Sequence, residues 1–180
     1  MRTSAIVYSL VASAVVVAFA ACSNAPANSR IGVIAPDRAQ FPPVGDLLVH
    51  RCGELDCHGN SQRNFKIYGC EGLRLDPAAT PGCPSMLGPL ATATSVAEYD
   101  ATYRSLVGLE PTVMSAVIHD HGKDPELLTF VRKARGDESH KGGALITPGD
   151  DQDQCITSWL ANKTDVDACA RALALPVTPR

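Results

Sequence analysis

The chain has 180 residues, of which 45% are apolar, 19% are charged and only 5% are aromatic, and its formal net charge is −3. This length suits one domain, and the apolar share is ordinary for a globular protein. The absence of a basic patch argues against nucleic acid as a partner. The low aromatic content, with 14 glycines and 13 prolines, predicts a thin core that disulfides, a buried cofactor or both must reinforce.

The amino terminus has the pattern of a secretory signal. A single arginine precedes an apolar run over residues 5–21, which is short for a membrane span and has no stop-transfer flank. The run ends in F-A-A-C, which resembles a bacterial lipobox. We therefore expect residues 1–21 to be a lipoprotein signal peptide and Cys22 to carry the lipid. The alternative is an ordinary signal peptide that leaves Cys22 as a thiol.

Residues 22–43 are rich in Ala, Asn, Ser and Pro, a composition that predicts a flexible tether between the lipid and the folded part. Ser23 follows the lipidated cysteine, and by similarity to enterobacterial sorting rules this indicates the outer membrane. We expect an outer-membrane lipoprotein in the cell envelope, which faces the periplasm or the exterior and is held by its lipid anchor. Disulfides form in that compartment.

Short helices separated by long loops are predicted downstream of the tether. The patterns predict helices over 44–51, 95–109, 124–135 and 165–173, and one that begins at Asp150 or Asp151 and carries Trp159. Ser95 and Glu98 have the spacing of a capping box, and Val96 is expected on the apolar face of that helix. Residues 65–68 alternate like a brief strand, and residues 111–118 are an apolar piece of undecided type.

The stretch that carries chemistry is R-C-G-E-L-D-C-H-G at residues 51–59. It differs by two inserted residues from C-x-x-C-H, the signature of c-type haem attachment. In that reading Cys52 and Cys57 bind the two vinyl groups, His58 is the proximal iron ligand, and Gly59 lets the backbone pass close to the macrocycle. Four intervening residues can span the vinyls if they loop outward.

Two other readings of the same residues remain open. In an oxidising compartment Cys52 and Cys57 could form a short-loop disulfide, which would leave His58 as an ordinary exposed histidine. The same three side chains and a fourth ligand could instead bind zinc.

The order of these motifs resembles the small c-type cytochrome-like domains of bacterial envelope proteins, notably the planctomycete cytochrome type. The matching positions are Cys57, His58, Gly59, the L-R-L-D segment at 73–76, Leu127, Leu128, Trp159 and Leu160. The resemblance covers about residues 43–163. It implies a mainly α, cytochrome c-like domain over 44–175 with long irregular loops, followed by a tail over 176–180.

The chain departs from this family at the sixth iron ligand as well as at the cysteine spacing. The family places a methionine in the loop before the last helix, whereas His140 occupies that loop here. His140 is therefore the candidate distal ligand. Met86, Met114, His119 and His121 are the alternatives.

The remaining four cysteines are expected to pair as neighbours in the sequence, Cys70 with Cys83 and Cys155 with Cys169. Each bridge would close a loop of about 14 residues and would contribute about 3 kcal/mol on the loop-entropy model. Two adjacent antiparallel helices would bring the second pair together.

The sequence contains no G-x-S-x-G, H-E-x-x-H or phosphate-loop motif, so we do not expect an enzyme. The resemblance implies an anchored monohaem c-type cytochrome that binds haem c and passes single electrons to a redox partner protein. The alternative is a haem-free, disulfide-stapled envelope lipoprotein with a structural or binding role.

Overall fold

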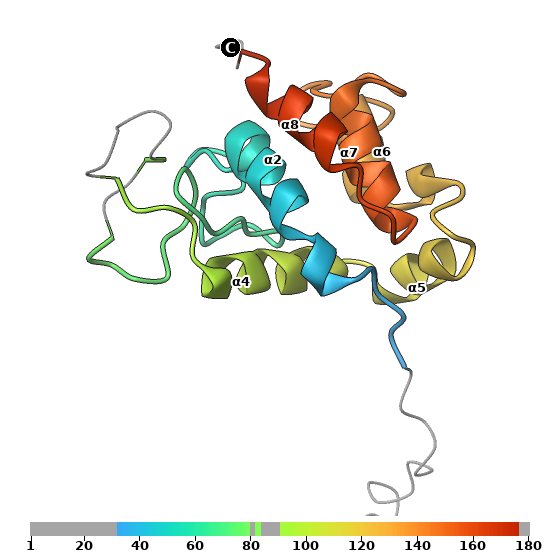
Figure 1. Cartoon of the computed structure of the whole chain (residues 1–180), viewed down its shortest axis with the longest axis horizontal. Coiled ribbons are helices and arrows are strands. Elements are labelled where there is room, and N and C mark those ends of the chain that lie inside the picture. Colours follow the sequence, from blue (N-terminus) through green and yellow to red (C-terminus); the bar gives the residue numbers. More distant parts are fainter. Residues whose placement is uncertain (1–31, 80–81, 84–90, 177–180) are drawn as a thin grey trace, which may run out of the picture. The chain divides into compact units, whose positions relative to one another are not determined.

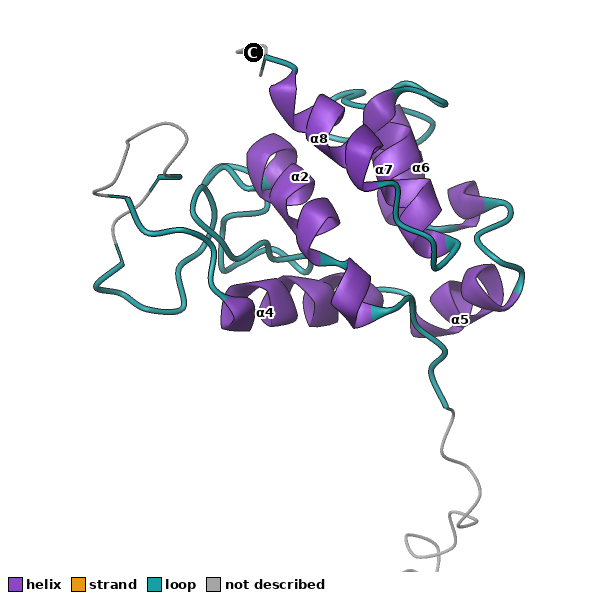
Figure 2. Ribbon diagram, in the orientation of Figure 1, coloured by secondary structure: helices purple, strands orange, loops and turns teal. Residues whose placement is uncertain are grey.

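The computed structural model describes residues 32–79, 82–83 and 91–176, and the signal peptide, Cys22 and Met86 lie outside these ranges. The chain divides into two compact units, Met1–Gly32 and Val33–Arg180, and the first is described only at Gly32. Within the described ranges the second unit is mainly helical, as predicted, and contains no strand (Figure 2). None of the described helices combines the length and apolarity needed to cross a membrane.

The described part of the second unit contains six α-helices and two 3-10 helices, joined by loops (Figure 1). In chain order they are η1 (Arg38–Gln40), α2 (Pro42–Cys52), α4 (Val96–Val107), α5 (Pro111–His119), η3 (Pro125–Leu127), α6 (Thr129–Arg135), α7 (Asp151–Leu160) and α8 (Val166–Ala174). Helix α2 contacts α4, α7 and α8, so it lies at the centre of the unit and leads directly into the motif at 51–59.

The unit begins at Val33, earlier than the boundary expected at 44. The reason is Phe41, which is 1% exposed and packs against Trp159 with ring centroids 5.1 Å apart. The indole Nε1 of Trp159 also donates a hydrogen bond to the carbonyl of Asp37 at 3.2 Å. Residues 33–43 therefore belong to the folded unit.

Helix α4 begins as predicted, because Ser95 and Glu98 form the capping box. The buried Glu98 carboxylate also lies 3.1 Å from the Arg74 guanidinium, so the L-R-L-D segment is fixed to the start of this helix. Val96 was expected on the buried face, but it is 78% exposed. The helix instead turns Glu98 and Thr102 inward, where both have hydrogen-bond partners.

The prediction of a strand over residues 65–68 is wrong, because this segment makes only an isolated bridge between Tyr68 and Leu73. Its backbone finds side-chain partners instead of a second strand. The amide of Lys66 donates to the Ser105 hydroxyl at 2.7 Å, and the amide of Tyr68 donates to the Thr102 hydroxyl at 2.8 Å. Two hydroxyls of α4 thereby pair with the backbone amides of this half-buried segment.

The single helix expected over 124–135 is divided into η3 and α6. The residue between them, Leu128, is extended (φ −82°, ψ 125°), which turns its side chain into the core, where it is 1% exposed. The predicted end is confirmed: Gly136 closes α6 in the left-handed conformation, with φ 85°. Residues 111–118 are helical within α5.

Helices α7 and α8 are held side by side by a disulfide between Cys155 and Cys169, both fully buried (Figure 1). The second disulfide joins Cys70 to Cys83. These are the pairings expected from the sequence. The end of α8 is also tied to α2, because the Arg51 guanidinium donates to the carbonyls of Ala172, Leu175 and Pro176 at 3.0–3.1 Å.

Candidate functional site

The two cysteines of the motif are separated by a loop that projects outward and closes on itself. Helix α2 ends at Cys52, and residues 54–56 are exposed. The amide of His58 donates to the carbonyl of Cys52 at 3.1 Å, and the amide of Cys57 donates to that of Glu54 at 2.8 Å. Residues 54–56 therefore project into solvent, while the backbone of His58 stays hydrogen-bonded to Cys52.

Gly59 is required by the backbone of this loop itself. A Cβ atom added at Gly59 would overlap the carbonyl oxygen of Gly53 and would lie 3.0 Å from the Glu54 backbone. The Gly59 amide donates to the Glu54 carbonyl at 3.0 Å, which completes the closure. From the sequence, glycine was expected here because the backbone would pass close to a macrocycle. The closed loop is a second reason for a glycine at this position.

His58 is held with one ring nitrogen engaged. Its Nδ1 lies 3.0 Å from the carbonyl oxygen of Phe65, a geometry in which Nδ1 carries the proton and donates it. Burial lowers the pKa of His58, and the positive charges of Arg63 and Lys133 lower it further, while the Phe65 hydrogen bond opposes this shift. A neutral imidazole that donates from Nδ1 has its Nε2 lone pair available for a metal ion.

His140 lies next to His58 although 82 positions separate them in the sequence. Their ring centroids are 5.9 Å apart, and the ring planes are inclined by 25°. The Nδ1 atom of His140 is 3.4 Å from the Gly143 carbonyl, so it too is engaged on the Nδ1 side. The loop that carries His140 returns to α6, where the amides of Leu145 and Ile146 donate to the Ala134 carbonyl at 2.8 and 3.1 Å.

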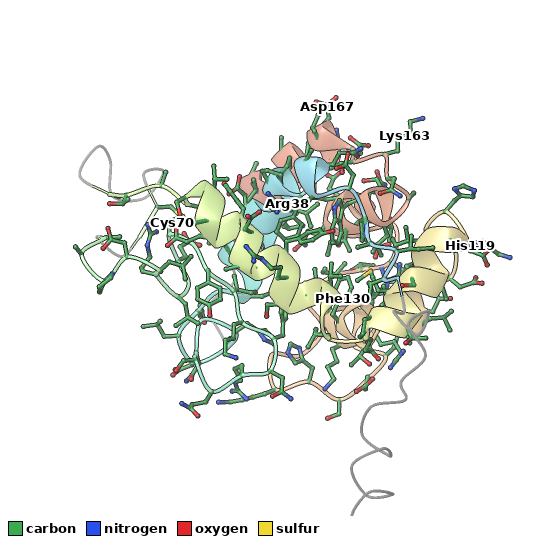
Figure 3. The ribbon with its side chains drawn as sticks, turned by 90° about the horizontal axis from the view of Figure 1, so that it is seen from below. Arg38, Cys70, His119, Phe130, Lys163 and Asp167 are labelled. Carbon is green, nitrogen blue, oxygen red and sulfur yellow. A yellow bond between two sulfur atoms is a disulfide. The ribbon has the colours of Figure 1, made fainter. Side chains whose placement is uncertain are left out.

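A cavity of about 280 Å³ opens beside this histidine pair. Its walls are formed by Leu48, Cys52, His58, Arg63, Asn64, Phe65, Leu109, Thr129, Phe130, Lys133, Ala134, His140, Leu145, Ile146 and Ile156. Most of these residues are apolar, and Figure 3 labels Phe130, which comes from α6. A second hollow of about 230 Å³, which Cys57 lines, shares His58 and His140 with the first.

The residues that line the site are of the types that could hold a haem group. Two imidazoles, each with Nδ1 at a carbonyl oxygen, border an apolar cavity near the lower end of the usual size of small-molecule sites. Within the described ranges the sulfurs of Cys52 and Cys57, both half-buried, are not bonded to each other. The described residues contain no group of three or more His, Cys, Asp or Glu side chains placed to hold a metal ion.

The alternative iron ligands are less well placed where they are described. His119 projects away from α5 and is 77% exposed (Figure 3). His121 is exposed, and the buried Met114 does not line the cavity. Met86 lies outside the described residues.

Sequence reasoning missed the polar side chains around the cavity. Arg63 and Lys133 line both hollows, and the carbonyl of Phe65 orients His58. No motif marks these positions, because a backbone carbonyl and two isolated cations leave no pattern in the sequence. Their place at the site becomes visible only in the structure, where both cations line the hollows beside the two histidines.

No protein-family model, curated protein or solved structure matches this chain.

Proposed function

We propose that the protein is a membrane-anchored, monohaem c-type cytochrome-like electron carrier of the bacterial cell envelope. The observation that supports this proposal best is the pair His58 and His140, drawn from distant loops onto one apolar cavity that Cys52 also lines. The C-x-x-x-x-C-H motif adds support, because its cysteines and histidine border the two adjoining hollows.

Each residue has a defined role in this proposal. Cys52 and Cys57 would each add an S–H bond across a vinyl C=C, so that sulfur bonds to one carbon, the proton goes to the other, and no oxidant is needed. His58 would bind the iron through Nε2 as the proximal ligand, and His140 would bind it as the distal ligand. The bound haem would supply one-electron chemistry between ferric and ferrous iron.

The ligand set affects the reduction potential. Two histidines favour the ferric state relative to the histidine–methionine pair of many cytochromes c, so we expect a lower potential. The apolar walls formed by Leu48, Phe130 and Ile156 would keep water away from the group and would limit reorganisation when its charge changes.

The proposed location rests on the amino-terminal sequence and the disulfides. The signal peptide, the lipid on Cys22 and a tether over the residues before Gly32 are proposals from sequence, since they lie outside the described residues. The two disulfides support an extracytoplasmic compartment, in which covalent haem attachment also takes place.

The test is expression of the mature chain together with a cytochrome c maturation system. We expect a reduced α-band and haem that stays with the polypeptide after denaturation. A colourless product with a disulfide between Cys52 and Cys57 would refute the electron carrier and would favour the haem-free, disulfide-stapled lipoprotein with a structural or binding role.

A further inference from the structure

Arg63 makes a contact with the attachment loop that the proposed function does not use. Its guanidinium reaches back to two successive carbonyl groups: Nε lies 3.3 Å from the Cys57 oxygen, and Nη2 lies 3.1 Å from the Asp56 oxygen. The turn that brings it there is short, since the Arg63 amide donates to the Asn60 carbonyl at 3.1 Å.

The loop needs such a donor because its own amides are used internally. The amides of Cys57, His58 and Gly59 all donate to carbonyls of residues 52–54. The carbonyls of Asp56 and Cys57 point the other way, and the next one, of His58, accepts from the Ile67 amide at 2.9 Å. The segment 60–67 therefore holds three consecutive carbonyls of the motif.

The longer spacing makes this support more important. Two residues more than in C-x-x-C-H give the loop more conformations to lose when it is ordered. A guanidinium can bridge two carbonyls with its planar fork of donors, whereas an ammonium group is a single point charge on a flexible stem.

We propose that Arg63 is a positioning residue: by bridging the carbonyls of Asp56 and Cys57, it holds the four residues between the two cysteines so that Cys57 and His58 line the hollow that adjoins the cavity. The part of this inference that concerns haem rests on the proposed function. The part that concerns the loop holds for the haem-free chain as well, so the two can be tested separately.

The first experiment measures amide hydrogen exchange in the haem-free mature chain. We expect Arg63→Gln to speed exchange at Cys57, His58 and Gly59 about tenfold, because two hydrogen bonds to a charged donor are lost. Arg63→Lys keeps the charge but not the bridge, and we expect an increase of about threefold. Arg104→Gln is the matched control, because it removes an exposed guanidinium whose only partner among the described residues is Asp100.

Three results would overturn the positioning role. These are unchanged loop exchange in Arg63→Gln, full protection in Arg63→Lys, which would show that charge alone suffices, and equally faster exchange in the α4 amides, which would show a general loss of stability.

The second experiment maps the thioether bonds after expression with the maturation system. Wild type is expected to carry haem on both sulfurs, while Arg63→Gln retains the Cys52 bond and loses most of the Cys57 bond. Attachment at both sulfurs in the variant, with wild-type yield, would contradict the inference. Absence of covalent haem from wild type would contradict the proposed function instead, and the exchange data would still decide the role of Arg63 in the loop.

Discussion

Replacement of Gly59 by alanine tests whether the attachment loop has the closed conformation described. The added Cβ would overlap the Gly53 carbonyl oxygen and would lie 3.0 Å from Glu54, closer than the roughly 3.3 Å of a favourable carbon–oxygen contact. The backbone must therefore move. Two hydrogen bonds depend on its present course, from the His58 amide to Cys52 and from the Gly59 amide to Glu54.

The cost follows from these contacts. Two backbone hydrogen bonds are worth about 1 kcal/mol each, and the residual clash brings the expected loss to about 2–3 kcal/mol, within the usual range for point mutants. For a unit of this size that loss lowers Tm by roughly 4–12 °C.

Differential scanning calorimetry of the haem-free mature chain measures this loss. Gly32→Ala is the control, because a Cβ at Gly32 meets nothing within 4 Å. A Gly59→Ala variant whose Tm stays within about 2 °C of wild type would refute the closed-loop geometry.

Three further predictions concern stability, pH and the sixth ligand. Replacing Cys155 and Cys169 together by alanine opens a loop of 14 residues and should cost about 3 kcal/mol, measured by urea unfolding. Burial raises the pKa of the Asp46 carboxyl above 3.8, so the charged form is disfavoured in the folded state. Below pH 3.8 the Asp46→Asn variant should therefore be as stable as wild type. As pH rises from 3.8 through the raised pKa, the variant should become increasingly more stable than wild type. In haem-loaded protein, His140→Leu should convert a low-spin ferric spectrum to high-spin with haem retained, whereas the exposed His119→Leu should change nothing.

Each of these has a clear contrary result. If replacing Cys155 and Cys169 lowers the free energy of unfolding by less than about 1 kcal/mol, the loop-entropy argument is contradicted. A stability difference for Asp46→Asn that is constant with pH would show that the carboxyl does not titrate differently on folding. An unchanged spin state in His140→Leu would remove His140 from the iron.

Features set by local interactions were predictable from the sequence. The capping pair Ser95 and Glu98, the cap at Asp150 and the left-handed Gly136 each act within a few residues, and the structure has all of them. The helix ends could be predicted because the groups that satisfy them are neighbours in the chain.

Features set by distant contacts were not predictable. Leu128 interrupts a helical pattern because its side chain gains more by packing in the core, and Phe41 joins the fold because Trp159 is there to meet it. Lys66 and Tyr68 bond to hydroxyls on a helix some 34–39 positions later. Tertiary packing overrides local propensity at each of these positions.

The candidate site depends partly on local motifs and partly on distant contacts. Cys52, Cys57 and His58 could be selected as a motif, and His140 could be selected from the order of motifs in the chain. The meeting of His58 and His140 at one cavity, which Cys52 also lines, depends on the return of the 137–146 loop onto α6, which no local signal specifies. Cys57 lines the adjoining hollow.

The central claim is that the sulfurs of Cys52 and Cys57 bind a porphyrin. Trypsin should release residues 52–63 as one peptide, because Arg51 and Arg63 bound it and no lysine or arginine lies between them. Mass spectrometry of this peptide, taken from protein matured in the envelope, should show one haem bound through both sulfurs. A haem-free peptide in which the two sulfurs are joined to each other would contradict the account.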